Sequence, residues 1–374
     1  MQLPYARPRL MELHEQTWLP SIIRQPIQNM LTAVWITPFP IIQSLAPYEA
    51  VADTLENMVN AIEQEDRVEG VVNNPMRIVD CCSGAGGPMP AVEKRLNERR
   101  LAKALPPIPF LLSDIHPHIS AWRSLSQASP SRSLSYLPYP VDATHAPAAM
   151  KEQRHFRTFC LAFHHFDEQG ARGILEDAMR TADGIGIFEL QKFNLSNLLT
   201  ITLLFPACWV LTPSLKPSLA FTELSLSPGF TTQLGDSNDS QNPLRPSFEP
   251  ISEFCSAIVA TIFFTYIIPV IPFILVLDGY VSAYRTRSLP HLMHLANLAA
   301  MKVSLERGKD TEGEEEVEWL WESGTERHTW PGGVMTWVIG RRDRTVSSED
   351  ETGSLSGQAE YDPSQGNDND QMNG

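Results

Sequence analysis

Arg77-Ile-Val-Asp-Cys-Cys-Ser-Gly-Ala-Gly-Gly-Pro-Met-Pro90 is the stretch of sequence that decides the fold. It predicts a short apolar strand ending at Asp80, then a glycine loop, then a helix that begins at a proline, where a missing N–H costs nothing. Gly84, Gly86 and Gly87 let the backbone adopt positive φ and leave no Cβ between the loop and a ligand. The stretch therefore predicts a ligand cradle at the carboxyl end of a parallel strand, where open α/β sheets bind their ligands.

The details of the loop favour one class of ligand. A dinucleotide fingerprint has a third glycine and an acid about 20 residues further on. Here Met89 stands at the third glycine position, and the acid Asp114 lies about 30 residues beyond Gly84. Asp80 can meet an α-amino group, which suits S-adenosylmethionine. A nicotinamide-dependent oxidoreductase is the alternative, and titration with both cofactors separates the two.

Two further predicted strands end in acids. Pro109–His116 ends near Asp114, which is placed to bind the ribose hydroxyls, with the next residue beside the adenine. Pro140–Thr144 is predicted as the third strand, where Asp142 and the following amide face the adenine edge. The predicted cofactor-binding residues are Asp80, Ser83, Gly84, Gly86, Gly87, Asp114, Ile115, Asp142, Ala143 and Phe163.

The predicted catalytic residues follow the next two strands. Phe156–Phe166 is predicted as a fourth strand running into His164 and His165, and the fifth strand ends at Glu189. Adjacent histidines at a strand end would point in opposite directions, so one is expected in the pocket. A histidine can take a proton from a nucleophile near neutral pH, and Glu189 would position the acceptor. The alternatives are packing histidines and methyl transfer by alignment alone.

These motifs resemble those of the class I S-adenosylmethionine-dependent methyltransferases, and more narrowly a group of fungal and bacterial methyltransferase-like proteins. The resemblance rests on Trp18-Leu19-Pro20, the Asp-x-Cys-x-Gly-x-Gly-Gly-Pro loop, Phe-His-His-Phe, and Asp-Gly-x-Val-Ser with a following arginine at 278–285. It covers roughly residues 10–340. It implies an α/β Rossmann-like sheet of seven strands with a terminal antiparallel hairpin, and S-adenosylmethionine as cofactor.

The composition of the chain limits the kinds of ligand and partner that we expect. The net charge of −15 argues against nucleic acid, since phosphate binding needs a basic surface. The five cysteines show no paired metal spacing, so we expect reduced thiols and no metal site. The first apolar run is broken at residues 24–26, so no signal peptide is expected and the catalytic domain is predicted to be cytoplasmic.

The chain divides into five predicted parts. Helices are predicted over Ser21–Val34, Tyr48–Glu63 and 288–308, and the closing strands over Val317–Trp321 and Val334–Gly340. The parts are an N-terminal helical cap (1–70), the cofactor-binding half (71–193), a hydrophobic insertion (194–282), a C-terminal helix and strand hairpin (283–342), and an acidic tail (343–374) expected to be disordered.

The insertion holds two apolar segments, 195–211 and 254–277, around a polar stretch at 214–250. About 20 apolar residues span a bilayer, so the second segment is long enough and the first is marginal. One interpretation is a membrane hairpin with Arg285 and Arg287 as flanking charges; the other is an apolar lid over the substrate pocket. Both suit a small or lipid-like acceptor. The alternative function is a non-catalytic, membrane-associated protein that keeps the fold.

Overall fold

The computed structural model describes residues 10–39, 41–68, 70, 75–212, 258–310 and 318–343. Within them the chain forms one seven-stranded sheet with the order β3-β2-β1-β4-β5-β7-β6. The polar stretch predicted at 214–250 and the tail from residue 344 onward lie outside these ranges.

Five parallel strands are followed by an antiparallel hairpin, which confirms the predicted fold class. The β6–β7 turn lies beside the carboxyl end of β5, because Glu189 pairs with Thr336. The parallel strands are β1 (Arg77–Cys81), β2 (Phe110–Ser113), β3 (Leu134–Tyr136), β4 (His155–Cys160) and β5 (Gly184–Glu189), and the hairpin is β6 (Trp319–Thr329) with β7 (Gly333–Arg342).

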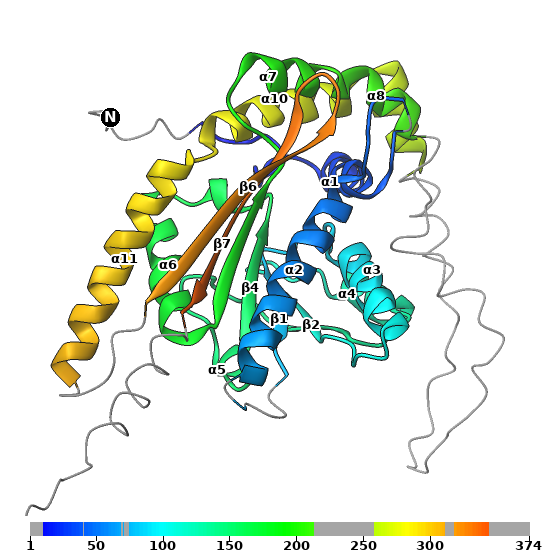
Figure 1. The fold of residues 1–374 in the computed structure, drawn as a ribbon. Coiled ribbons are helices and arrows are strands. Elements are labelled where there is room, and N and C mark those ends of the chain that lie inside the picture. Colours follow the sequence, from blue (N-terminus) through cyan, green and yellow to red (C-terminus); the bar gives the residue numbers. More distant parts are fainter. Residues whose placement is uncertain are drawn as a thin grey trace, which may run out of the picture.

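Helices cover both faces of the sheet, with α2, α3 and α4 on one side and α6 and α11 on the other (Figure 1). Neighbouring residues of β1 show this division. Ile78 packs into the core beneath α2, α3 and α4, and Val79 packs into the core beneath α6 and α11. Burial on both faces explains why the parallel strands are continuous apolar runs. The bounds are α2 (Pro47–Val68), α3 (Met89–Ala102), α4 (Ile119–Ala128), α6 (Glu168–Thr181) and α11 (Leu289–Asp310), with a short α5 (Ala148–Lys151).

A third apolar core lies across the carboxyl end of the parallel strands (Figure 1). It joins α1 to both segments of the predicted insertion, through buried residues such as Ile27, Leu211 and Ile274. The insertion and the N-terminal helix thus form one covering layer. Its helices are α1 (Ser21–Ile36), α7 (Leu195–Thr202), α8 (Leu204–Leu211), η4 (Phe263–Ile267) and α10 (Val270–Arg285).

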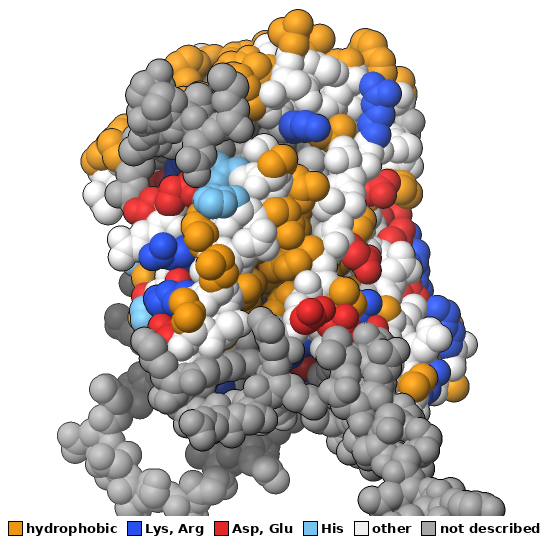
Figure 2. Space-filling view, turned by 60° about the vertical axis from the view of Figure 1, so that its left-hand side comes forward, with side chains coloured by type: hydrophobic (Ala, Val, Ile, Leu, Met, Phe, Trp, Pro, Cys, Tyr) orange, Lys and Arg blue, Asp and Glu red, His pale blue; other side chains and the backbone are white. Residues whose placement is uncertain are grey.

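The described residues contain no single helix that is long and apolar enough to cross a membrane. Ile258–Ile267 and Val270–Arg285 pass that test only together, and they are bent by 76°. The predicted spanning hairpin therefore gains no support, although apolar side chains gather along the top of the molecule over this layer (Figure 2). Membrane association through 195–211 and 254–277 stays a prediction. The exposed residues include Leu195, Trp209, Ile267 and Phe273.

The third strand is not where the sequence predicts it. The strand is Leu134–Tyr136, and Pro140–Thr144 forms the loop after it. Pro138 and Pro140 lack the N–H groups that a strand would donate. Asp142 then accepts the Thr144 backbone N–H at 2.8 Å, a local turn that competes with strand pairing.

The C-terminal elements differ in detail from their predicted forms. In α11 the residues Leu292, Leu295 and Ala299 are buried, whereas Leu289, Leu298 and Met301 are exposed. The first hairpin strand continues eight residues past Trp321, to Thr329. Its charged residues are tolerated because β6 is an edge strand with one face in solvent.

Candidate functional site

The glycine loop after β1 has the backbone that its sequence predicts. The φ angles of Gly84, Gly86 and Gly87 are 52°, 115° and 50°, and that of Cys82 is 63°. A Cβ at Gly84 would meet nothing within 4 Å, whereas one at Gly86 would lie 2.6 Å from Leu125 Cδ1. Gly84 therefore faces open space, and Gly86 is needed for packing against α4.

Asp80 lies buried beneath this loop without a cationic partner. Thr158 Oγ1 donates to its Oδ1 at 3.1 Å, and no lysine or arginine among the described residues forms an ion pair with it. Burial raises the pKa of Asp80 to about 7, and the charge of Asp114 adds to this despite hydrogen bonds from Ser83 and Thr158. Ionising this carboxylate without a partner therefore costs free energy, and a bound cation or N–H donor would stabilise the charged form.

Asp114 joins the loop to the second strand. Its Oδ2 accepts the Gly84 N–H at 2.8 Å, and its Oδ1 accepts the His116 N–H at 2.7 Å. The next side chain, Ile115, is 52% exposed although apolar. An acid and an exposed apolar side chain therefore stand together beside the open face of Gly84.

The remaining predicted cofactor residues lie in different surroundings. Asp142 is 56% exposed in its own turn, and Ala143 is buried. Ser83 is buried, and its hydroxyl donates to the Asp80 carbonyl at 3.0 Å. Phe163 packs in the core against Phe159, with ring centroids 5.6 Å apart. Its role at the cofactor stays a prediction.

His164 and His165 do not continue strand β4, as the sequence predicts. The strand ends at Cys160, Leu161 has a φ of 54°, and Phe163–His165 forms the 3₁₀ turn η1. In such a turn successive side chains do not alternate between faces. The two imidazole rings instead lie side by side with centroids 4.1 Å apart, so the prediction that they point apart is wrong.

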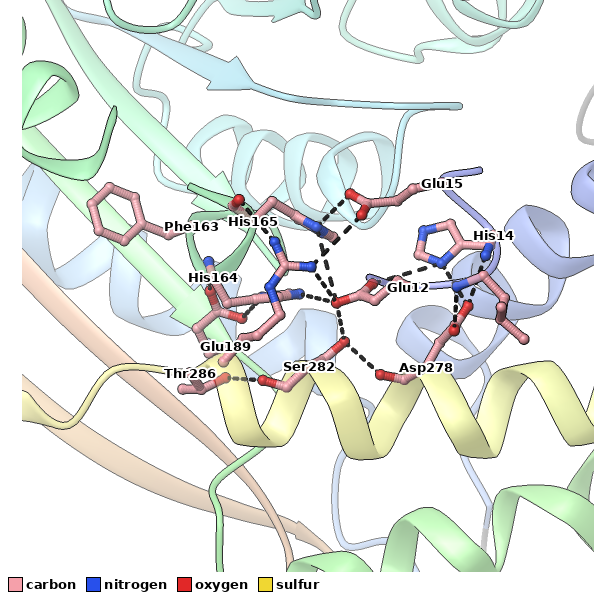
Figure 3. A network of polar contacts seen from close by, with 12 residues as sticks. Glu12, His14, Glu15, Phe163, His164, His165, Glu189, Asp278, Ser282 and Thr286 are labelled. Carbon is pink, nitrogen blue, oxygen red and sulfur yellow. Dashed lines mark hydrogen bonds and ion pairs between the residues drawn. The ribbon is translucent and has the colours of Figure 1, made fainter. Parts of the chain in front are cut away.

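His164 lies between two carboxylates (Figure 3). Its Nδ1 is 2.8 Å from Glu189 Oε2, and its backbone N–H donates to Glu189 Oε1 at 3.1 Å. On the other side, Nε2 is 3.2 Å from Glu12 Oε1. Burial alone would lower the pKa of His164, but the charges and hydrogen bonds of Glu189 and Glu12 raise it to about 10. Burial would likewise raise the pKa of Glu12, but the histidines lower it to about 2.

His165 is the more accessible of the two histidines, with 24% of its side chain exposed. Its Nδ1 lies 2.6 Å from Glu15 Oε1 and 4.0 Å from Glu12 Oε1. The predicted catalytic residues therefore form one cluster with Glu12 and Glu15. Glu189 contacts His164 directly, so its carboxylate is held by that histidine.

Arg285 and Arg287 hold this turn in place. Arg285 Nη2 donates to the His165 carbonyl at 2.8 Å. Arg287 donates to the carbonyls of Phe163 at 3.0 Å and Phe166 at 2.6 Å. These contacts hold the η1 turn in place, and the membrane-flanking role of the two arginines stays a prediction.

Asp278 positions the segment that carries Glu12 and Glu15. It lies inside α10, about two turns after the helix begins. Its carboxylate accepts the N–H groups of Leu13 at 2.6 Å and His14 at 3.0 Å, and it contacts His14 Nδ1 at 2.9 Å. Sequence reasoning missed this segment. The available signals were three ionisable residues within 12–15 and a lone acid ending a long uncharged run.

A surface hollow of about 300 Å³ lies elsewhere, between α2 and the β6–β7 hairpin. None of the predicted site residues lines it. Its lining includes Asp53, Asn57, Glu322, Trp337 and Arg341.

The strand order, with β7 antiparallel between β5 and β6, is that of a class I methyltransferase-like sheet. No protein-family model matches the chain, and no curated protein matches it. Solved structures with similarity include an O-methyltransferase family protein from Burkholderia thailandensis, at 12% identity, covering 87% of this chain and 72% of that one, with a TM-score of 0.33. An O-methyltransferase family 2 protein from Planctomyces limnophilus, in complex with apigenin, has 8% identity, coverages of 80% and 63%, and a TM-score of 0.33.

The pyocyanin biosynthetic protein PhzM has 9% identity and a TM-score of 0.33. The match covers 74% of this chain and only 53% of PhzM. Scores at this level carry no assignment of activity, so the fold rests on the strand order and the site on its own residues.

Proposed function

We propose that this protein is an S-adenosylmethionine-dependent methyltransferase. The observation that carries the proposal is the buried Asp80, which has no cationic partner among the described residues and lies beneath an open glycine turn at the end of the central strand. A buried carboxylate in this position suits a ligand that brings a positive charge to the loop. The α-ammonium group of S-adenosylmethionine is such a charge.

The residues at the loop fit the rest of this cofactor. Asp114 has carboxylate oxygens at the edge of the cradle and would accept the ribose hydroxyls, while the exposed Ile115 would cover one face of the adenine. Gly84 leaves the space for close approach. When bound, the cofactor supplies an electrophilic methyl group on a sulfonium ion. We assign Asp142 and Ala143 to the adenine edge.

The histidine cluster follows the neighbouring strand β4 and is proposed to face the acceptor. A histidine with a pKa near 10 is already protonated at neutral pH, so His164 is a poor proton acceptor and instead holds Glu12 and Glu189 in place. His165, which is partly exposed, is the histidine that can contact an acceptor. Alignment of the acceptor with the methyl group supplies much of the catalysis in such a reaction. We propose a small or lipid-like acceptor because an apolar layer covers this edge.

Calorimetric titration with S-adenosylmethionine tests the cradle. Gly84→Asn places a side chain in the open space at a φ of 52°, which asparagine tolerates better than other residues. We expect binding by the wild type and a loss of at least about tenfold in the variant, because the cradle is filled. This factor corresponds to about 1.4 kcal/mol.

Gly70→Asn is the matched control. Gly70 has a φ of 69°, nothing lies within 4 Å of its Cβ position, and it follows α2 away from the loop. This variant should bind as the wild type does. No binding by the wild type, or equal losses in both variants, would contradict the proposal.

A further inference from the structure

We infer that Glu12, His164 and His165 form a binding site for a divalent transition-metal cation. Their ligand atoms all lie within 4.8 Å of one another, and two histidine nitrogens with one carboxylate oxygen form a ligand set found in metalloproteins. The inference concerns residues beside the cradle and does not depend on the proposed cofactor. The sequence predicted no metal site, because the three ligands come from segments about 150 residues apart.

The distances between the ligand atoms suit a metal ion. Glu12 Oε1 is 3.2 Å from His164 Nε2 and 4.0 Å from His165 Nδ1. Metal–ligand bonds of about 2.0–2.2 Å in a tetrahedral arrangement separate the ligand atoms by roughly 3.4 Å. Small side-chain movements would therefore bring all three atoms around one ion.

The two histidine nitrogens that point into the site have carboxylate oxygens close by, but neither makes a well-aligned hydrogen bond. His164 Nε2 and His165 Nδ1 are both buried atoms without one among the described residues, although carboxylate oxygens lie at ion-pair distance. Those oxygens therefore lie off the directions in which ring N–H groups would donate. Close but misaligned oxygens are the arrangement expected when both groups are ligands of one cation.

Glu189 completes the arrangement from the other side of His164. Its Oε2 lies 2.8 Å from Nδ1, so Nδ1 donates to this carboxylate, and Nε2 is the nitrogen that would bind a metal ion after losing its proton. Histidines that bind metals almost always donate their other N–H to such a partner. The carboxylate–histidine pair is therefore already aimed at the Glu12 side of the ring.

The charges around the site also favour a cation. Glu12, Glu15 and Glu189 carry three negative charges, and Arg285, at 3.5 Å from Glu12 Oε1, carries one positive charge. A metal ion would displace the proton that His164 holds at neutral pH. With both histidines neutral, the cluster then has an excess of two negative charges, which a divalent ion would offset. Three protein ligands leave coordination positions open, as in catalytic metal sites. That an acceptor oxygen occupies one of them rests on the proposed function.

Titration of the untagged, chelator-treated full chain with Zn²⁺ tests the site, with Co²⁺ absorption as a second measurement. We expect one equivalent of tight binding and a tetrahedral-type Co²⁺ spectrum. Glu12→Gln and His165→Ala should each weaken binding by at least about tenfold, and Glu189→Gln by about 10–100-fold. His291→Ala is the matched control, because this partly exposed histidine contacts Glu168 and none of the three ligands, and it should bind as the wild type does.

Circular dichroism identifies variants that do not fold. If Glu12→Gln is unfolded, His165→Ala decides the question, because its side chain is partly exposed. Absence of Zn²⁺ binding by the wild type, or wild-type affinity in every folded variant, would overturn the inference. Titration of the same metal-free protein with S-adenosylmethionine keeps this result separate from the proposed cofactor.

Discussion

The glycine loop and the histidine cluster lie at the ends of neighbouring strands, and they are built in opposite ways. The loop comes from one continuous stretch, 80–88, whose backbone angles follow from its glycines. The cluster joins Glu12, His164 and Glu189 from three distant segments, and Arg285 from a fourth. The loop is therefore a local structure, whereas the cluster exists only when the whole fold is formed.

The glycine loop and the histidine cluster also differ in how their buried charges are paired. Asp80 forms no ion pair within the part of the chain that the structure describes, and burial raises its pKa to about 7. His164 has two carboxylate partners, and they raise its pKa to about 10 despite its burial. An isolated charge at the loop suits a site that waits for a cationic ligand, whereas a compensated network suits a rigid support.

The largest expected effect lies in the cluster. Glu189→Ala removes the partner of His164 Nδ1 and of its backbone N–H. Breaking one side of a buried ion pair costs about 3–5 kcal/mol, and the buried His164 ring would keep only Glu12 as a charged partner. We expect a decrease of that size in the free energy of unfolding, measured by urea denaturation. The control is Glu322→Ala on the exposed side of β6, which should change stability little.

A decrease below about 1 kcal/mol for Glu189→Ala would mean that His164 does not depend on the pair. The contrast between a rigid cluster and a local loop would then fail.

A smaller effect is expected at Arg287, whose buried guanidinium donates to the carbonyls of Phe163 and Phe166. Hydrogen bonds from charged groups contribute about 1.5–3 kcal/mol, so Arg287→Met should destabilise the protein by roughly 2–3 kcal/mol. Lys302→Met is the comparison, because Lys302 is half exposed and pairs with Glu176 at 2.6 Å. Surface pairs contribute about 1 kcal/mol or less. Equal effects of the two changes in thermal melts would show that Arg287 is not needed to hold η1.

The smallest effect concerns the loop and depends on pH. A cationic ligand needs Asp80 ionised, and the free protein binds a proton there below a pKa of about 7. Affinity for S-adenosylhomocysteine should therefore fall about tenfold between about pH 8 and about pH 6. Calorimetry across this range, with Asp80→Asn as the control that removes the titration, measures the effect. A flat profile in the wild type would show that Asp80 does not meet the ligand charge.

The same pKa predicts the pH dependence of stability. The folded value near 7 lies above the unfolded value near 3.8, so the folded protein binds more protons in between. This contribution to stability is present below about pH 4 and is lost as the pH rises through about 7. Asp80→Asn should therefore raise the melting temperature most at pH 8 and above.

The parts of the molecule that the sequence predicted are those set by local rules. The glycine loop, the helix that follows it, and the terminal hairpin each carry their own turn residues, and the structure has all three. The third strand was misplaced because an acid in a proline-rich turn resembles a strand end. Within a few residues, an acid in such a turn and an acid at a strand end give the same sequence pattern.

The cluster was only half predicted, because its contacts are not local. His164, His165 and Glu189 were identified at strand ends, but their side-by-side arrangement depends on the η1 turn. Glu12 belongs to a short run of ionisable residues at 12–15, but nothing in that run indicates a partner about 150 residues away. The role of Asp278 was not predicted, because a helix-interior acid that accepts another segment's N–H groups leaves no periodic signal.

A crystal structure with S-adenosylhomocysteine, grown with the full chain, tests the central claim most directly. The account predicts the ligand in the cradle, with its amino group at Asp80, its ribose at Asp114 and its adenine beside Ile115. The ligand's absence from the cradle at saturating concentration, or its presence only in the hollow between α2 and the β6–β7 hairpin, would contradict the account.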